Sequence, residues 1–89
     1  MHQLIFTDTY IKKELYFLKK HPELIERYKK TIKLMEININ HPSLRLHKLT
    51  GNLKEYHSIS INLVYRIVVK LIGNKILFIY LGHHQEVYP

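Results

Sequence analysis

The sequence predicts an α+β fold in which a two-helix hairpin packs on one face of a twisted, mainly antiparallel sheet of about four strands. The expected element order is β-α-α-β-β-β. Three observations predict this class. Apolar residues recur at helical spacing in the first half of the chain, the period changes to two after Gly51, and the length is only 89 residues. A chain of this length holds one core, so we expect residues 1–89 to form a single domain.

The segment before residue 21 indicates a strand followed by a helix. Gln3 to Phe6 forms a short apolar run, and Thr7 then offers a side-chain oxygen for a helix N-cap. Apolar residues follow at i, i+4 and i+7, with two aromatic residues beside them: Ile11, Leu15 and Leu18, then Tyr10 and Phe17. We expect this helix to end at His21-Pro22.

The second helix is predicted to begin at Pro22, because the N–H that proline lacks has no partner in a first helical turn. Its apolar stripe consists of Leu24, Tyr28, Ile32 and Met35. Only the His-Pro joint separates it from the first helix, so the two helices should form a hairpin.

Helical periodicity stops between Asn38 and Asn52, where proline, glycine and asparagine indicate a connecting segment. This segment is unusually basic, with Arg45, His47 and Lys48. Loops often carry function, so the segment is either a binding surface or a solvated linker.

Alternation of apolar and polar residues predicts three successive strands after Gly51. Ile59 and Ile61 belong to the first, residues 65–71 to the second and the apolar run 76–81 to the third, with a tight turn at Gly73-Asn74. The amino-terminal strand is expected to join them at an edge or in the centre. Successive side chains of a strand point to opposite faces, so five polar residues should lie on the face opposite the apolar residues of these strands. They predict a polar concave face formed by Ser58, Ser60, Asn62, Arg66 and Lys70.

The composition narrows the function classes. A formal charge of +7 favours polyanionic partners, and the absence of cysteine excludes disulfides, thiolate catalysis and cysteine-based zinc sites. No apolar run approaches the ~18 residues of a membrane span, and the first ten residues lack the features of a signal peptide. We therefore expect a cytoplasmic protein with no membrane partner.

No cofactor or metal is expected. The sequence contains no HExxH motif, no glycine-rich phosphate loop and no GxSxG elbow. His83 and His84 are adjacent on a strand or at its end, so their side chains tend to point to opposite faces and chelate one ion poorly.

The remaining chemistry-bearing residues suit metal-free cleavage of RNA, which needs a base, an acid and a cation for the phosphorane charge. Histidine titrates near neutral pH, and arginine offers a planar fork to phosphate oxygens. The candidates are His47, His57, His83, His84, Arg66, Lys48, Lys54 and Tyr88. Each also has a structural interpretation: His57 as a rim residue, Tyr88 as a terminal packing residue, and Arg66 as a partner of Glu55 or Glu86.

Three segments in this order resemble the RelE/ParE superfamily of bacterial type II toxin–antitoxin toxins. They are residues 41–51 (HPSLRLHKLTG), 65–69 (YRIVV) and 82–88 (GHHQEVY). The resemblance spans nearly the whole chain and is greatest to the YoeB-like and YafQ-like mRNA interferases.

The resemblance implies roles for individual residues. Arg66 matches the phosphate-binding arginine, His84 the catalytic histidine that acts as general acid, and Tyr88 the carboxy-terminal aromatic that holds the substrate nucleotide. His47 falls where the YoeB-like branch has a glutamate base and the YafQ-like branch a histidine, so it is the candidate general base. The expected RNA-binding residues are Arg45, Lys48, Lys54, His57 and His83.

The sequence also departs from the family pattern. Ser58 and Ser60 stand on a strand where RelE has lysines, and His83 replaces a small residue. A lysine-driven mechanism is therefore not expected, and the role of His83 is open between a surface residue and a second phosphate contact.

The implied function is that of a ribosome-dependent mRNA endoribonuclease that cleaves in the A site through the 2′-hydroxyl and is neutralised by a cognate acidic antitoxin. The rival hypothesis is a non-enzymatic toxin of the ParE branch acting on DNA gyrase. That branch generally lacks the pairing of histidine and arginine that His84 and Arg66 provide. A third is an inactive toxin or plain RNA-binding module.

Overall fold

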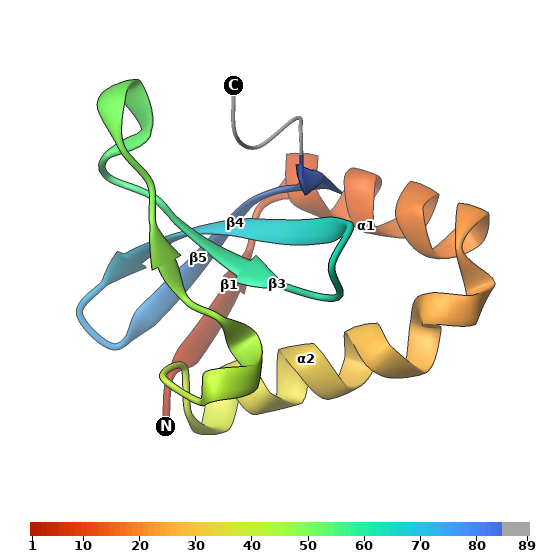
Figure 1. Ribbon diagram of the computed structural model, residues 1–89, viewed down its shortest axis with the longest axis horizontal. Helices are drawn as coiled ribbons and strands as arrows, with labels where there is room; N and C mark the ends of the chain where they lie inside the picture. Colours follow the sequence, from red (N-terminus) through yellow and green to blue (C-terminus); the bar gives the residue numbers. More distant parts are fainter. Residues whose placement is uncertain (85–89) are drawn as a thin grey trace.

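The computed structural model describes residues 1–84 and contains two α-helices on one side of a five-stranded mixed sheet (Figure 1). The α-helices and strands are β1 (Gln3–Phe6), α1 (Asp8–Lys20), α2 (Ile25–Ile37), β2 (His47–Lys48), β3 (His57–Ser60), β4 (Tyr65–Ile72) and β5 (Lys75–His83). Short 3₁₀ turns cover η1 (Pro22–Leu24), η2 (Pro42–Leu44) and η3 (Gly51–Leu53).

The strand order across the sheet is β1-β5-β4-β3-β2. β5, β4, β3 and β2 pair antiparallel in turn, while β1 pairs parallel with β5 at one edge. The predicted α+β class is confirmed, and the sheet has one more strand than expected. The additional strand, β2, is two residues long, too short to show an alternating pattern in the sequence.

The first helix is capped as predicted, because the Thr7 hydroxyl accepts a hydrogen bond from the Tyr10 backbone N–H at 3.2 Å. Its buried face differs from the predicted stripe. Ile11 and Leu15 are 40% and 65% exposed, whereas Tyr10 and Phe17 are buried. The larger aromatic side chains occupy the buried positions instead, and the Tyr10 ring centroid lies 5.1 Å from that of Phe78.

The second helix buries the stripe that the sequence predicts. Tyr28 and Met35 are buried, and Leu24 and Ile32 pack against the same core. Two consecutive hydrogen bonds join the helices. The Tyr10 hydroxyl lies 2.7 Å from the Tyr28 hydroxyl, which donates to the Glu14 carboxylate at 2.6 Å. Burial raises the pKa of both phenols far above its ordinary value, so both stay protonated.

A β-bulge changes the alternation along β5. Val68 is opposite Tyr80 and the next residue, Val69, is opposite Phe78, so Ile79 is the extra residue. Phe78 contributes to the helix-side core, whereas Ile79 and Tyr80 both pack with Val68 on the opposite side. The bulge therefore moves an additional large side chain to the face that the helices do not cover.

Candidate active site

The sheet register brings the main predicted site residues to the face opposite the helices. Arg66 on β4 pairs with Ser60 on β3 and with Gly82 on β5. His47 pairs with Ser58, which in turn pairs with Val68. Directly paired residues share a face, and so do residues two apart on one strand, which places His47 and Arg66 on the same side.

Arg66 is held on this face by a neighbouring hydroxyl. Its Nη1 atom donates to the Ser58 Oγ atom at 3.4 Å, and Ser58 is fully buried. Ser60, also buried, donates to the Asn62 carbonyl at 2.7 Å. The two buried serines therefore position the arginine and the end of β3.

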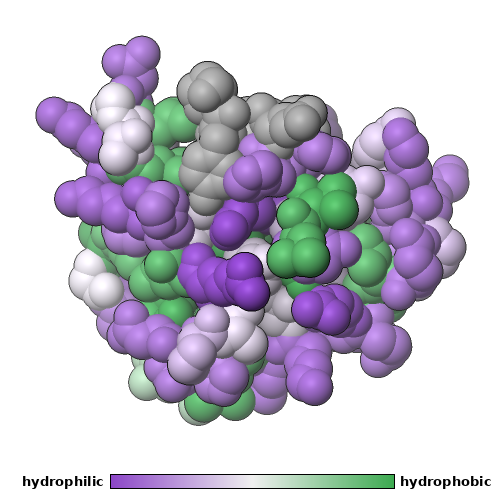
Figure 2. All heavy atoms as spheres, in the orientation of Figure 1, coloured by the Kyte–Doolittle hydropathy of each residue, from purple (hydrophilic) through white to green (hydrophobic). Residues whose placement is uncertain are grey.

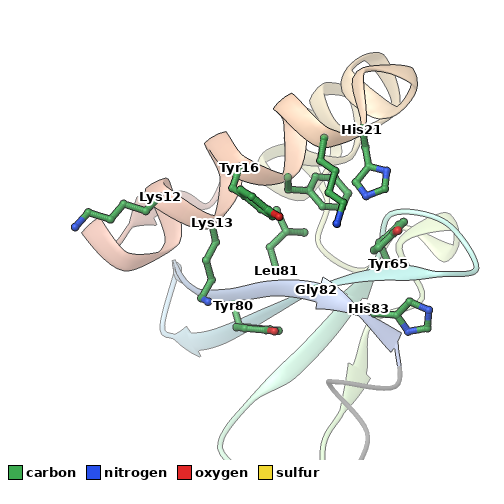
Figure 3. A pocket seen from close by; sticks show the side chains of 11 residues that line it. Lys12, Lys13, Tyr16, His21, Tyr65, Tyr80, Leu81, Gly82 and His83 are labelled. Atoms are coloured by element: carbon green, nitrogen blue, oxygen red, sulfur yellow. The ribbon is translucent and has the colours of Figure 1, made fainter.

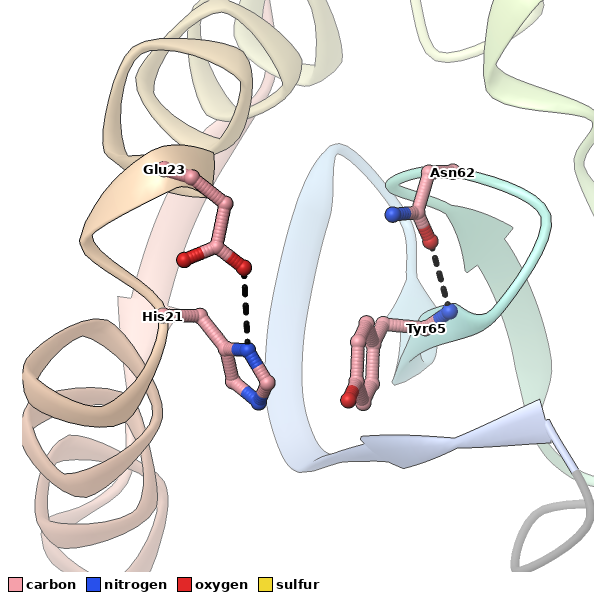
Figure 4. Close-up of polar contacts among 4 residues, drawn as sticks. All are labelled: His21, Glu23, Asn62 and Tyr65. Atoms are coloured by element: carbon pink, nitrogen blue, oxygen red, sulfur yellow. Dashed lines mark hydrogen bonds and ion pairs between the residues drawn. The ribbon is translucent and has the colours of Figure 1, made fainter.

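His84 is positioned by the loop between β3 and β4. The Asn62 Oδ1 atom accepts hydrogen bonds from the backbone N–H groups of Val64 and Tyr65 at 2.9 and 2.8 Å (Figure 4). The His84 N–H then donates to the Val64 carbonyl at 2.7 Å. His84 is exposed and follows directly after β5, the strand on which Gly82 pairs with Arg66.

The two histidines lie on opposite sides of Arg66 along the sheet. His47 pairs with Ser58, which pairs with Val68, two residues after Arg66 on β4. The His84 backbone N–H bonds to the carbonyl of Val64, two residues before Arg66.

This face is less polar than the sequence predicts. A second apolar cluster lies on it, consisting of Leu49 and Val68 with Leu53, Tyr56, Ile79 and Tyr80. On the surface that Figure 2 turns to the viewer, hydrophobic patches also lie between hydrophilic side chains. The bulge in β5 and the folding of segment 49–56 onto the sheet produce this cluster, and neither follows from the parity of single strands.

Lys48 and His57 lie on the other side of the sheet from Arg66. They pair with each other, and His57 pairs with Val69, a residue of the helix-side core. Burial, followed by the charges of Lys48 and His47, lowers the pKa of His57 below its ordinary value. Its Nδ1 atom is buried and has no hydrogen-bond partner within the described part of the chain.

The remaining predicted residues are dispersed. Arg45 and Lys54 are exposed on the segment between α2 and β3, and Arg45 adopts a left-handed conformation with φ of 49°. His83 lies on the helix side, with its ring centroid 5.8 Å from that of Tyr65. Tyr88, like Glu86, lies outside the described residues.

Asn62 is the residue whose part in the site the sequence did not reveal. Its side chain organises the loop that receives the His84 backbone, although it was assigned only to a polar face. The signal that could have identified Asn62 is the Asx turn. In such a turn the side-chain oxygen of an asparagine accepts a hydrogen bond from the backbone N–H two residues further along the chain, here that of Val64.

Within residues 1–84, no group of three or more histidine, aspartate or glutamate side chains is arranged to hold a metal ion. The helices described are too short or too polar to cross a membrane.

No protein-family model matches the sequence, and no curated protein sequence matches it. Several solved structures, however, match the fold of the chain. YafQ from E. coli BL21(DE3) superposes with a TM-score of 0.80 at 14% identity over 100% of both chains. A chain of the E. coli DinJ–YafQ toxin–antitoxin complex gives 0.78 at 18% identity, over 99% of this chain and 98% of that one. A chain of the YoeB–YefM complex from Staphylococcus aureus gives 0.73 at 21% identity, over 94% and 98%.

These likenesses define the class of fold, that of small α+β toxins from toxin–antitoxin pairs. The chain has the fold of the YafQ and YoeB toxin structures, which is the fold that the resemblance implied.

Proposed function

We propose that this chain is the toxin of a bacterial type II toxin–antitoxin pair and acts in the cytoplasm as a ribosome-dependent, metal-independent mRNA endoribonuclease. The observation that carries the proposal is that His47 and Arg66 lie on one face of the sheet while His84 directly follows the strand that pairs with Arg66, in a fold shared with YafQ and YoeB.

Each residue has a role in the proposed reaction. The 2′-hydroxyl of the substrate attacks the adjacent phosphorus, and His47 accepts the hydroxyl proton. The Arg66 guanidinium stabilises the charge that develops on the phosphorane oxygens. His84 donates a proton to the departing 5′-oxygen. The products are a 2′,3′-cyclic phosphate, which can hydrolyse to a 3′-phosphate, and a 5′-hydroxyl.

Dependence on the ribosome is part of the same proposal. The two imidazoles are spaced widely on the sheet, so the site gains from a substrate that is already bent into an in-line geometry. Holding reactants in such a geometry supplies much of the barrier reduction in well-oriented reactions. Exposed Arg45 and Lys54 are placed to contact ribosomal phosphates, and Tyr88 is proposed to hold the nucleotide at the site.

Primer extension on mRNA from cells expressing the chain tests the activity. We expect 5′-hydroxyl ends at positions in frame with codons, and the same ends when the chain is added to purified ribosomes translating a defined message. Absence of cleavage, together with loss of gyrase supercoiling activity, would instead support the rival ParE-like function.

We also propose a cognate acidic antitoxin as partner. The net charge of +7 favours an acidic protein, and two structural neighbours were solved in complexes that pair DinJ with YafQ and YoeB with YefM. Co-expression with the adjacent small reading frame should yield a stable complex and restore growth. Failure on both counts would remove the toxin–antitoxin assignment.

A further inference from the structure

A second concave site lies between α1 and the end of β5, and it includes Tyr80, whose ring also borders the apolar cluster on the opposite face (Figure 3). The cleft has a volume of about 500 Å³ and is lined by residues from both elements. β1 pairs with β5 only as far as Phe78, so the edge of β5 beyond it is not covered by β1. The residues that decide its chemistry are Lys12, Lys13, Tyr16, Lys20, Tyr80 and His83.

The charged residues that line this cleft in the described part of the chain are basic. Three lysines of α1 line it, and none of them forms an ion pair within residues 1–84. Two of the three lysines of α2 differ, because Lys29 and Lys33 lie 3.9 and 3.7 Å from glutamates one turn away. No acidic residue of the described chain lines the cleft, so it is suited to an anionic ligand.

Aromatic faces accompany the charges. The Lys13 ammonium lies 4.7 Å from the centroid of the Tyr80 ring, and that of Lys20 lies 5.7 Å from the centroid of the Tyr16 ring. Figure 3 shows Lys13 reaching from α1 toward Tyr80 on β5. Tyr16 is 66% exposed, so its ring is accessible to a ligand.

Gly82 fixes the position of the Tyr80 ring. A Cβ atom at residue 82 would lie 2.5 Å from the Tyr80 Cε2 atom, closer than any carbon contact allows. The absence of a Cβ atom at residue 82 therefore allows the ring to lie across the backbone of Gly82, where it forms one side of the cleft.

We propose that this cleft binds a nucleotide of single-stranded RNA, with the base stacked on Tyr16 or Tyr80 and the phosphates on the lysines of α1. Aromatic faces alternating with unpaired cations match a strand whose bases and phosphates alternate. An acidic peptide would use the lysines but would leave the ring faces without a planar partner, so RNA fits the cleft better.

The position of the cleft relates it to the candidate active site. Gly82 and His83 line the cleft, and Gly82 pairs with Arg66 on β4. RNA that passes around the end of β5 would therefore have one phosphate at Arg66 and a flanking nucleotide in the cleft. The inference rests on the proposed function only in taking RNA as the ligand.

Fluorescence anisotropy with a labelled 2′-O-methyl RNA hexamer tests the cleft, because this probe lacks the nucleophile and cannot be cleaved by the proposed reaction. The first variant carries Lys12→Gln, Lys13→Gln and Lys20→Gln. Its matched control carries Lys19→Gln, Lys29→Gln and Lys33→Gln, so both proteins have a formal charge of 7 − 3 = +4.

We expect the cleft variant to bind the probe at least about tenfold more weakly than the control. The slope of log K against log salt should also fall by about 2, the change expected when three phosphate contacts to a single strand are lost. Equal losses and equal slopes in the two proteins would show diffuse attraction only and would overturn the proposal.

Stacking is tested at the exposed ring. Tyr16→Leu should weaken binding about tenfold, whereas Tyr16→Phe should bind like the parent because it keeps the aromatic face. Unchanged binding by Tyr16→Leu, or tighter binding of a hexaglutamate peptide than of the RNA, would assign the cleft to an acidic protein segment and contradict the inference.

The two proposals fail in different ways. Cleft-dependent binding of the probe without ribosomal cleavage would refute the proposed function and leave the RNA cleft intact. If the chain cleaves mRNA on the ribosome but its cleft variants bind the probe as the parent does, only the proposal that the cleft binds RNA is refuted.

Discussion

The two faces of the sheet use the same strands for different purposes. On the helix side, every second residue of β4 and three residues of β5 join a continuous core with α1 and α2, in which Ile67, Val69 and Phe78 are fully buried. On the other side, the intervening residues include a half-buried Arg66 beside a small apolar cluster. The main core therefore lies on one face, and Arg66 and His47 lie on the other.

This division indicates that function and stability should respond separately to substitution. A change on the helix side should reduce the free energy of unfolding, whereas a change at Arg66 or His84 should affect RNA cleavage in a folded protein. The largest expected effect is on cleavage.

His84→Ala and Arg66→Ala should each reduce ribosome-dependent mRNA cleavage by about 10²- to 10⁴-fold, because each removes a positioned acid or charge stabiliser. Single-turnover cleavage on programmed ribosomes measures the loss. Lys75→Ala, a control that removes an exposed charge at the far end of β5, should cleave normally. Parental activity in both site variants would show that the site is elsewhere.

His47→Ala should also slow cleavage, but less than His84→Ala, since His47 lies two strands from Arg66 whereas His84 follows the adjacent strand. The same single-turnover assay ranks the two. A larger loss at His47 would reverse the assignment of the principal proton-transfer group.

Phe78→Ala should lower the free energy of unfolding by about 3–5 kcal/mol, since it leaves a cavity between β5, Phe6 and Tyr10. The neighbouring Ile79 is half-buried on the opposite face, so Ile79→Ala should cost only about 1 kcal/mol. Urea unfolding followed by circular dichroism compares the two. Equal losses would contradict the division between faces.

Tyr28→Phe should cost about 1–3 kcal/mol, because it leaves the fully buried Tyr10 hydroxyl and the Glu14 carboxylate without their shared partner. Tyr16→Phe is the matched control, since the Tyr16 side chain is mostly exposed. Urea midpoints of the two variants should differ, and coincident midpoints would show that the two hydrogen bonds contribute nothing.

The smallest effect concerns pH and His57. Its pKa is lowered in the folded chain relative to about 6.5 in the unfolded one, so the unfolded chain binds more protons between these two values. The contribution of His57 is complete above pH 6.5 and is lost as the pH falls through the folded pKa. His57→Asn should therefore reduce the difference in urea midpoint between pH 8 and pH 5. An unchanged difference would mean that His57 does not contribute to it.

Several elements were predictable because their signals are local. The Thr7 cap, the stripe of α2 and the turn at Gly73, with φ of 59°, depend on neighbours a few residues away. The buried face of α1 was predicted wrongly, because Ile11 and Leu15 have the correct spacing but Tyr10 and Phe17 fit the space that β4 and β5 leave.

The candidate site shows the same limit. Strand parity correctly grouped Arg66 with Ser58 and Ser60, since a period of two follows from the backbone alone. The placement of His47 beside them required β2, whose pairing with β3 is decided by the path of the segment after α2.

The sequence by itself determined the fold class, the order of the long elements, the basic charge and the set of residues able to bind phosphate and transfer protons, because composition and periodicity are properties of the chain. Only the tertiary structure decided that Ile79 bulges, that His57 and Lys48 turn away from Arg66, and that His83 lines a cleft with the lysines of α1. These outcomes depend on strand register and on competition for space in the core, which arise between residues far apart in the chain.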